Sequence, residues 1–278
     1  MDRYAVMGNP VAHSKSPRIH ALFAVQTRQQ LQYDAILVEK DGFRESVADF
    51  LRHGGKGLNI TVPFKEEAWA LAARRSDRAE LAGAVNTLVL DESGRHFGDN
   101  TDGTGLVRDL LYNHGAVLRN KRLLLVGAGG AARGVIEPLL GEAPALLVIA
   151  NRTAGKAVEL ARLFCEHGHT EGCGLDDVNG QPFDIIINAT AASLSGEVPA
   201  LPESVVTADS WCYDMMYADR PTAFMVWTQQ LGAALSMDGL GMLVEQAAES
   251  FCLWRHVRPD TAPVIQALRH PVCSEPAR

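Results

Sequence analysis

RLLLVGAGGAA, residues 122–132, has the form of a buried strand followed by a glycine-rich turn and the start of a helix. Its aliphatic run is typical of a parallel strand that is covered on both faces. The turn follows the pattern G-x-G-x-x-A, in which the first glycine permits a tight turn, the second lets the backbone approach a pyrophosphate, and the alanine lets helix and strand pack closely. A glycine-rich turn without a ligand is the alternative reading. The order strand, turn, helix favours a dinucleotide site, with contacts expected from Gly127, Ala128, Gly129, Gly130 and Ala131.

Strands and helices continue to alternate after this turn. ALLVIAN (145–151) and FDIIINAT (183–190) read as buried strands, and helices are expected over 131–140 and 153–168. Alternation of this kind builds a doubly wound parallel sheet. The sequence therefore predicts a Rossmann-type α/β domain over residues 104–238.

The rest of the chain predicts a second α/β unit. Residues 1–103 contain short β-rich runs, such as YAVMG and GLNITV, between helical stretches, and they are expected to form a substrate-binding and catalytic domain. Residues 239–270 are helical and have no strands of their own, so they are expected to return to the first domain and complete it. This arrangement leaves a cleft between two domains. Residues 271–278 read as a C-terminal tail.

The residues after the second strand of the Rossmann unit indicate which dinucleotide binds. An NAD site usually places an acidic residue there, about 20 residues beyond the glycine turn, to bind the ribose hydroxyls. This chain has Asn151, Arg152 and Thr153 instead, with Lys156 one turn later. Arg152 can meet a 2′-phosphate with its planar fork, and Thr153 can cap the next helix. An ordinary exposed helix start is the plain alternative, but at this position in the fold we expect NADP.

The first domain has polar residues where its strands end. Ser14 and Ser16 lie at a helix start, where hydroxyls and the helix dipole form a pocket for a carboxylate, although plain capping also explains Ser16. Lys65 follows the run NITV and lies in the first turn of a helix, where the dipole disfavours an ammonium. Asp102 lies in the loop GDNTDG, where it can be a turn former or the N-cap of a helix at 104–113.

The bulk composition excludes several classes of protein. A formal net charge of −7 argues against a nucleic-acid binder held by a cationic surface. No run approaches the roughly 18 apolar residues of a membrane-spanning helix, and the N-terminus does not read as a signal peptide. Five cysteines without a CxxC pair suggest reduced thiols, so we expect a cytoplasmic protein. Possible metal ligands cluster at Cys165, His167, His169 and Cys173, but a helix end plus a loop explains them, and no metal is expected.

Eight short motifs resemble, in order, the signature series of the shikimate dehydrogenase family, and the match extends over roughly residues 4 to 270. They are SKSP (14–17), NITVPFK (59–65), GAVNT (83–87), DNTDG (99–103), GAGGA (127–131), NRT (151–153), DMMY (214–217) and DGLGMLVEQ (238–246). Eight ordered motifs are far more specific than any single one. One segment, Ala191–Leu194, departs from the family pattern in the loop expected to lie beside the nicotinamide.

The resemblance implies a role for each matching residue. Lys65 and Asp102 are the catalytic pair, and Ser14 and Ser16 hold a substrate carboxylate. The residues at the ring hydroxyls of the substrate are Thr61, Asn86 and Gln246, with Tyr217 nearby. On the cofactor side, the resemblance adds Asp77, Thr190, Met215, Gly239 and Met242. The residues agree on one independent point: Met242 and Gln246 are i,i+4 neighbours on one helix face, so one can touch the cofactor and the other the substrate.

The implied activity is NADPH-dependent, reversible reduction of 3-dehydroshikimate to shikimate in aromatic amino acid biosynthesis. The implied partner is a small-molecule substrate, with no nucleic acid or membrane, and the protein is expected to be a monomer or a homodimer. Three alternatives stay open: a broader quinate/shikimate dehydrogenase, an enzyme similar to methylenetetrahydrofolate dehydrogenase, and a non-catalytic NADP-binding regulator on the same fold. The motif SKSP and Gln246 speak against the folate enzyme, and an intact Lys65 and Asp102 speak against the regulator.

Overall fold

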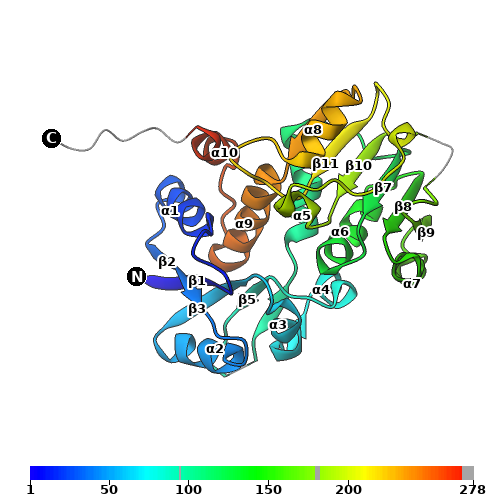
Figure 1. Ribbon diagram of the computed structural model, residues 1–278. Coiled ribbons are helices and arrows are strands. Elements are labelled where there is room, and N and C mark those ends of the chain that lie inside the picture. Colours follow the sequence, from blue (N-terminus) through cyan, green and yellow to red (C-terminus); the bar gives the residue numbers. More distant parts are fainter. Residues whose placement is uncertain (94, 179–181, 271–278) are drawn as a thin grey trace.

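Two α/β units, each built on a six-stranded sheet, meet along a layer of helices (Figure 1). The structure is a computed structural model and describes residues 1–93, 95–178 and 182–270. The first sheet has the strand order β2-β1-β3-β5-β6-β4. Its strands are β1 (Asp2–Gly8), β2 (Leu31–Leu37), β3 (Gly55–Ile60), β4 (Arg74–Arg75), β5 (Thr87–Val89) and β6 (Phe97–Asp99). The helices within this part of the chain are α1 (Ser16–Thr27), α2 (Phe43–Arg52), α3 (Lys65–Leu71) and α4 (Asp77–Ala82).

The pairing of this sheet brings four chain segments to one edge. β1 pairs with β3 in parallel, so both strands end at the same edge. β5 is antiparallel to β3, and β6 is antiparallel to β5, so β5 begins and β6 ends at that edge too. The register places Asn59 opposite Thr87 and Thr87 opposite Asp99. The loops after β1, β3 and β6 and the residues before β5 therefore share one edge.

The second sheet is parallel throughout and has the order β12-β11-β10-β7-β8-β9. This is the doubly wound Rossmann order, with the switch point between β7 and β10, so the predicted fold class is confirmed. Its strands are β7 (Arg122–Val126), β8 (Leu146–Asn151), β9 (Thr170–Gly174), β10 (Ile185–Asn188), β11 (Trp211–Asp214) and β12 (Leu235–Asp238). Its helices are α6 (Gly130–Gly141), α7 (Ala154–Phe164) and α8 (Ala223–Gln230), with 3₁₀ turns at Ala192–Ser195 and Glu203–Val205.

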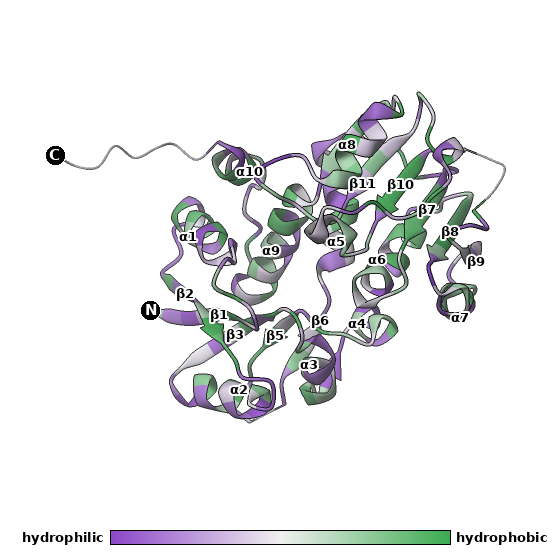
Figure 2. Cartoon of the chain, in the orientation of Figure 1, coloured by the Kyte–Doolittle hydropathy of each residue, from purple (hydrophilic) through white to green (hydrophobic). Residues whose placement is uncertain are grey.

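The central strands of this sheet are buried on both faces. All four residues of Leu123–Val126 have no exposed surface, and alternate residues pack into two different core clusters on opposite sides of the sheet. Figure 2 shows β7, β8 and β10 as the most uniformly hydrophobic strands. The helix expected over 153–168 is shorter than predicted, because α7 ends at Phe164 and β9 begins six residues later at Thr170.

The C-terminal helices return to the first unit, as the sequence predicts. α9 (Leu240–Arg255) packs against α1 and against α5 (Asp102–Arg108), and α10 (Ala262–Arg269) packs on α9 and α1. Close approach of α5 and α9 depends on Gly105, whose missing Cβ would lie 2.8 Å from the backbone N of Gln246. α5 continues into a π-helical turn, Asp109–Asn113. Asp102 is the first residue of α5, and the N-cap is Thr101, so Asp102 is not the cap of a helix that begins at 104.

The structure bears only in part on two expectations from the sequence, the C-terminal tail and the absence of a membrane-spanning helix. The tail expected at 271–278 lies outside the described residues. Within the described residues, each helix is too short or too polar to cross a lipid bilayer.

His20 on α1 is a polar side chain enclosed by aromatic rings. It has no exposed surface, it stacks on Tyr33 at 4.1 Å, and neither ring nitrogen has a hydrogen-bond partner among the described residues. Burial lowers the pKa of His20 from 6.5 to about 3, because the charged form would lose its hydration, and the nearby Asn59 side chain offsets only part of that loss. The imidazole is therefore neutral in the folded protein at neutral pH.

Replacement of His20 should make stability less sensitive to acid. The unfolded chain takes up a proton at His20 near pH 6.5, whereas the folded protein does so only near pH 3, so this residue destabilises the fold as the pH falls through that window. Between pH 7 and pH 4 the wild type should lose about 3 kcal/mol more than His20→Phe. Urea unfolding at several pH values measures this difference. His167→Phe, at an exposed histidine, is the control and should show the same dependence of stability on pH as the wild type. If His20→Phe also showed the wild-type dependence, the lowered pKa of His20 would be contradicted.

Candidate active site

Lys65 and Asp102 face each other at the shared edge of the first sheet. Lys65 is the first residue of α3, the helix that follows β3, and Asp102 is the first residue of α5, the helix that follows β6. The Nζ of Lys65 donates to Oδ2 of Asp102 at 2.5 Å, and the two side chains are 29% and 15% exposed. The pair is thus partly shielded from water but still reachable by a small molecule. The structure brings together the two residues that the resemblance names as catalytic.

Asn86 holds the other oxygen of Asp102. Its Nδ2 donates to Oδ1 of Asp102 at 2.7 Å, and its Oδ1 accepts from the backbone N–H of Thr101 at 2.9 Å. A backbone N–H can only donate, so this bond fixes which end of the Asn86 amide is the oxygen. The amide N–H₂ must therefore point at the carboxylate. One oxygen of Asp102 accepts a hydrogen bond from Lys65, and the other accepts one from Asn86.

Gln246 and Thr101 connect this edge to α9. The hydroxyl of Thr101 lies 3.3 Å from Oε1 of Gln246, and the Nε2 of Gln246 donates to the carbonyl of Leu243. Thr101 has no exposed surface and also bonds to Asn86 and Ser250. Sequence reasoning named Gln246 but missed Thr101 and Ser250. Thr101 lies inside the motif DNTDG and could have been found there, whereas Ser250 has no local signal.

The remaining substrate residues lie around the ends of β1 and β3. Thr61 directly follows β3, and its Cγ2 would lie only 2.3 Å from a Cβ on Gly8, the last residue of β1. The Oγ of Ser14 accepts from the backbone N–H of Ser16 at 3.2 Å. Ser16 is the first residue of α1 and is buried, whereas the N-cap is Lys15, so Ser16 is not the cap that its sequence suggests.

Tyr217 reaches this region from the second unit. It lies three residues beyond β11 and packs against the cluster formed by α1 and α9. The Nζ of Lys15 lies over the Tyr217 ring, 5.9 Å from its centroid, and bonds to Asp219 at 3.5 Å. The segment after β11 therefore approaches the start of α1, next to Ser14 and Ser16.

The glycine turn after β7 has the features of a dinucleotide site. Gly127 has a φ of 116°, in the left-handed region that favours glycine, and a Cβ there would lie 3.3 Å from the carbonyl of Ala189. Gly129 and Gly130 are exposed, and a Cβ on either would meet no atom within 4 Å. Gly129 is the N-cap of α6 and has no side chain to cap the helix. The backbone N–H groups of Gly130, Ala131 and Ala132 have no hydrogen-bond partner among the described residues, which suits a phosphate.

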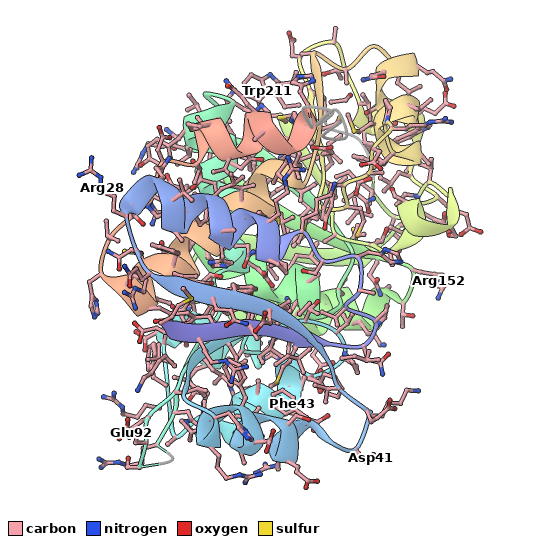
Figure 3. All side chains as sticks on the ribbon, turned by 90° about the vertical axis from the view of Figure 1, so that its left-hand side faces the viewer. Arg28, Asp41, Phe43, Glu92, Arg152 and Trp211 are labelled. Atoms are coloured by element: carbon pink, nitrogen blue, oxygen red, sulfur yellow. The ribbon has the colours of Figure 1, made fainter. Side chains whose placement is uncertain are left out.

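A cavity of about 740 Å³ lies along this turn and the ends of β8 and β10. Its lining includes Gly127, Asn151, Arg152 and Thr190. Arg152 and Lys156 are both exposed, and Figure 3 shows Arg152 extending from the body of the protein. Thr153 occupies the N-cap position of α7, but its hydroxyl makes no capping bond. Arg152 thus lines the cavity as an exposed cation, and Lys156 is exposed four residues further along α7. The cavity, the glycine turn and these cations fit a phosphorylated dinucleotide.

The residues expected at the nicotinamide lie at the ends of neighbouring strands. Met215 follows β11 and Gly239 follows β12, and a Cβ on Gly239 would clash with the carbonyl of Met215. Met242, in the first turn of α9, belongs to the same buried cluster that Met215 packs against. α9 thus starts at the edge of the second sheet. Gln246, four residues after Met242 on this helix, lies at the edge of the first sheet. The predicted i,i+4 pair therefore spans the two units, with Met242 at the edge of the second sheet and Gln246 at the edge of the first.

The loop Ala191–Leu194, which departs from the family pattern, is held by a buried carboxylate. Ser193 donates to Oδ2 of Asp214 at 2.6 Å, and Asn188 donates to Oδ1 at 3.2 Å. Burial raises the pKa of Asp214, and the hydrogen bonds from Ser193 and its other neutral neighbours only partly offset that effect. Sequence reasoning missed Asp214 because its acidic side chain lies in a strand end that reads as apolar.

Two other sequence candidates lie elsewhere. Asp77, the first residue of α4, lines a different cavity with Glu137 and Pro138, in the second half of α6, so the structure does not bring it to the cavity at the glycine turn. Among the described residues, no group of three or more His, Cys, Asp or Glu side chains is arranged to hold a metal ion, and this includes the cluster from Cys165 to Cys173.

Comparison with known families matches three parts of the chain. Residues 6–88 match the shikimate dehydrogenase substrate binding domain, residues 110–196 match the shikimate / quinate 5-dehydrogenase family, and residues 239–269 match the shikimate 5′-dehydrogenase C-terminal domain. The first match extends from within β1 to within β5, and the second contains the glycine turn.

Individual relatives align over nearly the whole chain. The shikimate dehydrogenase (NADP(+)) of Alkalilimnicola ehrlichii is 59% identical and covers 96% of this chain and 98% of its own. That of Hahella chejuensis is 60% identical, with 97% and 99% covered. The crystal structure of shikimate 5-dehydrogenase from Thermus thermophilus in complex with NADP(H) and shikimate is 32% identical, covers 97% of this chain and 99% of that one, and superimposes with a TM-score of 0.85.

Adding a side chain at Gly105 should separate α5 from α9. In Gly105→Ala the new Cβ would lie 2.7–2.8 Å from atoms of Gln246 and Met242, two of which are backbone, so the helices must shift. We expect a loss of about 1–3 kcal/mol in unfolding free energy, measured by denaturant titration. The control is Gly155→Ala in α7, where nothing lies within 4 Å; there, alanine should match or exceed wild-type stability. Equal stability of the two variants would show that the space between α5 and α9 at Gly105 can accommodate a Cβ.

Proposed function

Because the chain belongs to the shikimate dehydrogenase family, we propose that it catalyses the reversible, NADPH-dependent reduction of 3-dehydroshikimate to shikimate. The observation that carries this proposal is the contact between Lys65 and Asp102. Full-length relatives at 59–60% identity carry the same activity in their names. The protein is an NADP-dependent oxidoreductase of a biosynthetic pathway.

We propose that the cavity at the glycine turn holds the cofactor. The free N–H groups at the start of α6 bind the pyrophosphate, with Gly129 and Gly130 leaving room for it. Arg152 and Lys156 meet the 2′-phosphate, and Arg152 does so as a planar fork. Bound NADPH supplies the hydride that reduces the substrate carbonyl.

Lys65 donates the proton that the reduction consumes. As an ammonium it donates a proton to the oxygen that becomes the shikimate hydroxyl, and in the oxidative direction it takes that proton back. Asp102 holds the ammonium by one oxygen and is itself held through the other by Asn86. This orientation places a positive charge where negative charge develops on the substrate.

The other polar residues position the substrate. Ser14 and Ser16, at the start of α1, bind the carboxylate, assisted by the helix dipole. Thr61, Asn86 and Gln246 bind the ring hydroxyls, and the approach of Tyr217 toward the start of α1 is consistent with a place in the same pocket.

We also propose the division into domains expected from the sequence. Residues 1–103, completed by 239–270, form the substrate domain, and residues 104–238 form the NADP domain. A cytoplasmic location is consistent with the free thiols of the four described cysteines, Cys165, Cys173, Cys212 and Cys252. A monomer or a homodimer remains our proposal for the assembly.

Removal of the Lys65 amine should lower turnover much more than affinity. Lys65→Met should reduce kcat for shikimate oxidation by about 10²–10⁴-fold, the usual contribution of a general acid–base group, with a much smaller change in KM. Absorbance of the reduced nicotinamide follows the reaction. Lys56→Met, on the exposed face of β3, is the control and should keep wild-type rates. Near wild-type turnover by Lys65→Met would exclude Lys65 as the proton donor.

Arg152 should discriminate between the two dinucleotides. Arg152→Ala should weaken NADPH binding by about 10–100-fold, because one charge-assisted hydrogen-bonding group is lost, and leave NADH binding within twofold. Isothermal titration with each reduced dinucleotide measures both affinities without turnover. Arg162→Ala, in the last turn of α7, is the control. An equal loss for NADPH and NADH would remove the role assigned to Arg152.

A further inference from the structure

The guanidinium of Arg78, on α4, bonds to residues on both sides of Asp102 in the chain. Its Nε and Nη2 donate to the two oxygens of Asp99, at 2.7 and 2.5 Å, and its Nη1 donates to Oγ1 of Thr104 at 2.5 Å. Asp99 lies three residues before Asp102 and Thr104 lies two residues after it. One planar side chain therefore holds both ends of the segment 99–104.

Asp99 is an ionised carboxylate inside the protein. Its side chain is 3% exposed, and it also accepts from the hydroxyl of Ser76 and from the backbone N–H of Asn100. Burial alone would raise the pKa of Asp99, but the bonds from Arg78 and Ser76 outweigh that effect and hold the pKa below its usual value of 3.8. A bidentate contact between ionised groups in such a site is strong and has a defined geometry.

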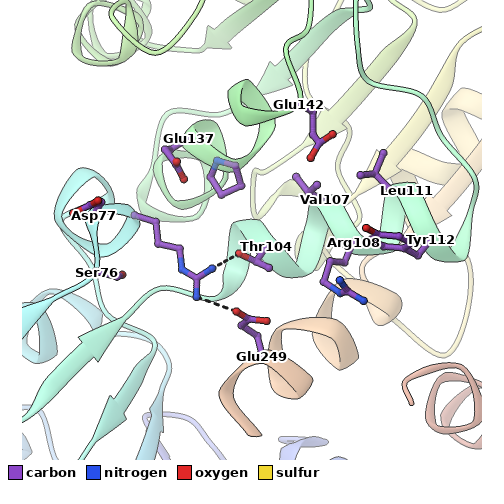
Figure 4. Close-up of a pocket in the computed structure, with 12 residues that line it drawn as sticks. Ser76, Asp77, Thr104, Val107, Arg108, Leu111, Tyr112, Glu137, Glu142 and Glu249 are labelled. Carbon is purple, nitrogen blue, oxygen red and sulfur yellow. Dashed lines mark hydrogen bonds and ion pairs between the residues drawn. The ribbon is translucent and has the colours of Figure 1, made fainter. Parts of the chain in front are cut away.

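Arg78 also connects this segment to α9. Its Nη2 donates to Oε1 of Glu249 at 3.3 Å, and Glu249 is held from its other side by Arg258 at 2.6 Å. Figure 4 shows the bonds that reach Thr104 and Glu249. Gln246 lies three residues before Glu249 on the same helix. The helix that carries Gln246 and the segment that carries Asp102 are therefore joined through one cation.

We propose that Arg78 is a positioning residue for the reaction: by holding Asp99, Thr104 and Glu249 together, it sets where Asp102 meets Lys65. This proposal rests on the proposed function, because it assigns Arg78 to the same active site. Its hydrogen bonds within the described part of the chain go to these three residues and not to Lys65 or Asp102 themselves. It acts on the reacting pair only through the segment that carries Asp102.

Lysine cannot replace Arg78 in this geometry. An ammonium is a point charge and cannot bond to both oxygens of Asp99 in one plane while a further N–H reaches Thr104. The guanidinium also lines a cavity of about 540 Å³ with Ser76, Thr104 and Glu249, and its side chain is 22% exposed. A guanidinium ion from solution can therefore reach the space that the side chain would leave.

The test is chemical rescue of a truncated side chain. In Arg78→Ala we expect kcat for shikimate oxidation to fall at least 10-fold, while NADPH affinity, measured by titration, stays within twofold. Arg78→Lys should recover less than a third of the lost rate. Guanidinium chloride at non-denaturing concentrations should raise kcat of Arg78→Ala several-fold, relative to equal sodium chloride.

Arg75→Ala is the matched control. Arg75 is 21% exposed and bonds to Glu80 and to the carbonyls of Trp69 and Ala72, not to the segment 99–104. Its removal should leave kcat within twofold, and guanidinium should not change it. If Arg78→Ala keeps wild-type kcat, or if guanidinium fails to raise a reduced kcat, Arg78 is not a positioning residue. If the wild type and Arg75→Ala do not oxidise shikimate, the proposed function is what fails.

A second variant keeps the test valid if Arg78→Ala does not fold. Thr104→Val removes only the bond on the C-terminal side of Asp102, at a partly exposed position of the same cavity. We expect kcat to fall about threefold or more with an unchanged circular dichroism spectrum. An unchanged kcat in this variant, with Arg78→Ala unfolded, would assign Arg78 to stability alone.

Discussion

The contact between Lys65 and Asp102 depends on the register of the first sheet. Because β5 runs antiparallel to both β3 and β6, which flank it, Asn59, Thr87 and Asp99 lie side by side across three strands. The residues that follow Asn59 and Asp99 and those that precede Thr87 must then lie at one edge. A shift of one residue in either pairing would turn the side chains of that strand to the opposite face. The catalytic pair is therefore a consequence of strand pairing.

The second constraint is the short distance between α5 and α9. α9 begins at the end of β12, in the second sheet, and contacts α5 where Gly105 leaves no side chain between the helices. This packing carries Gln246 to Thr101 at the first edge, while Met242, one turn earlier, stays with Met215 at the second. The relative placement of cofactor and substrate residues thus depends on backbone contact between two helices, which flexible side chains could not define as sharply.

Local patterns predicted much of the fold, whereas most of the proposed substrate and nicotinamide residues were expected only from the family resemblance. The turn 127–132 and the run NITVPFK are continuous in sequence, so spacing alone identified the Rossmann unit and the helix that begins at Lys65. The supporting residues could not be predicted in this way. Asn59 bonds to Ser250, which is 191 residues away, and Arg78 bonds to Asp99 and Glu249 on different elements. Such partners are brought together only by tertiary packing, and no local period reveals them.

Each of the two edges has a buried carboxyl group just before a functional segment, but the pKa values of the two groups are shifted in opposite directions. Asp99 precedes the segment of Asp102 and is paired with Arg78, so its pKa is lowered and it stays ionised. Asp214 precedes Met215 and accepts bonds from neutral donors such as Ser193, so burial raises its pKa. Breaking a buried ion pair costs several kcal/mol, whereas exchanging neutral hydrogen bonds costs about 1 kcal/mol each. The ion pair at the substrate edge therefore costs more to break than any single hydrogen bond at the cofactor edge.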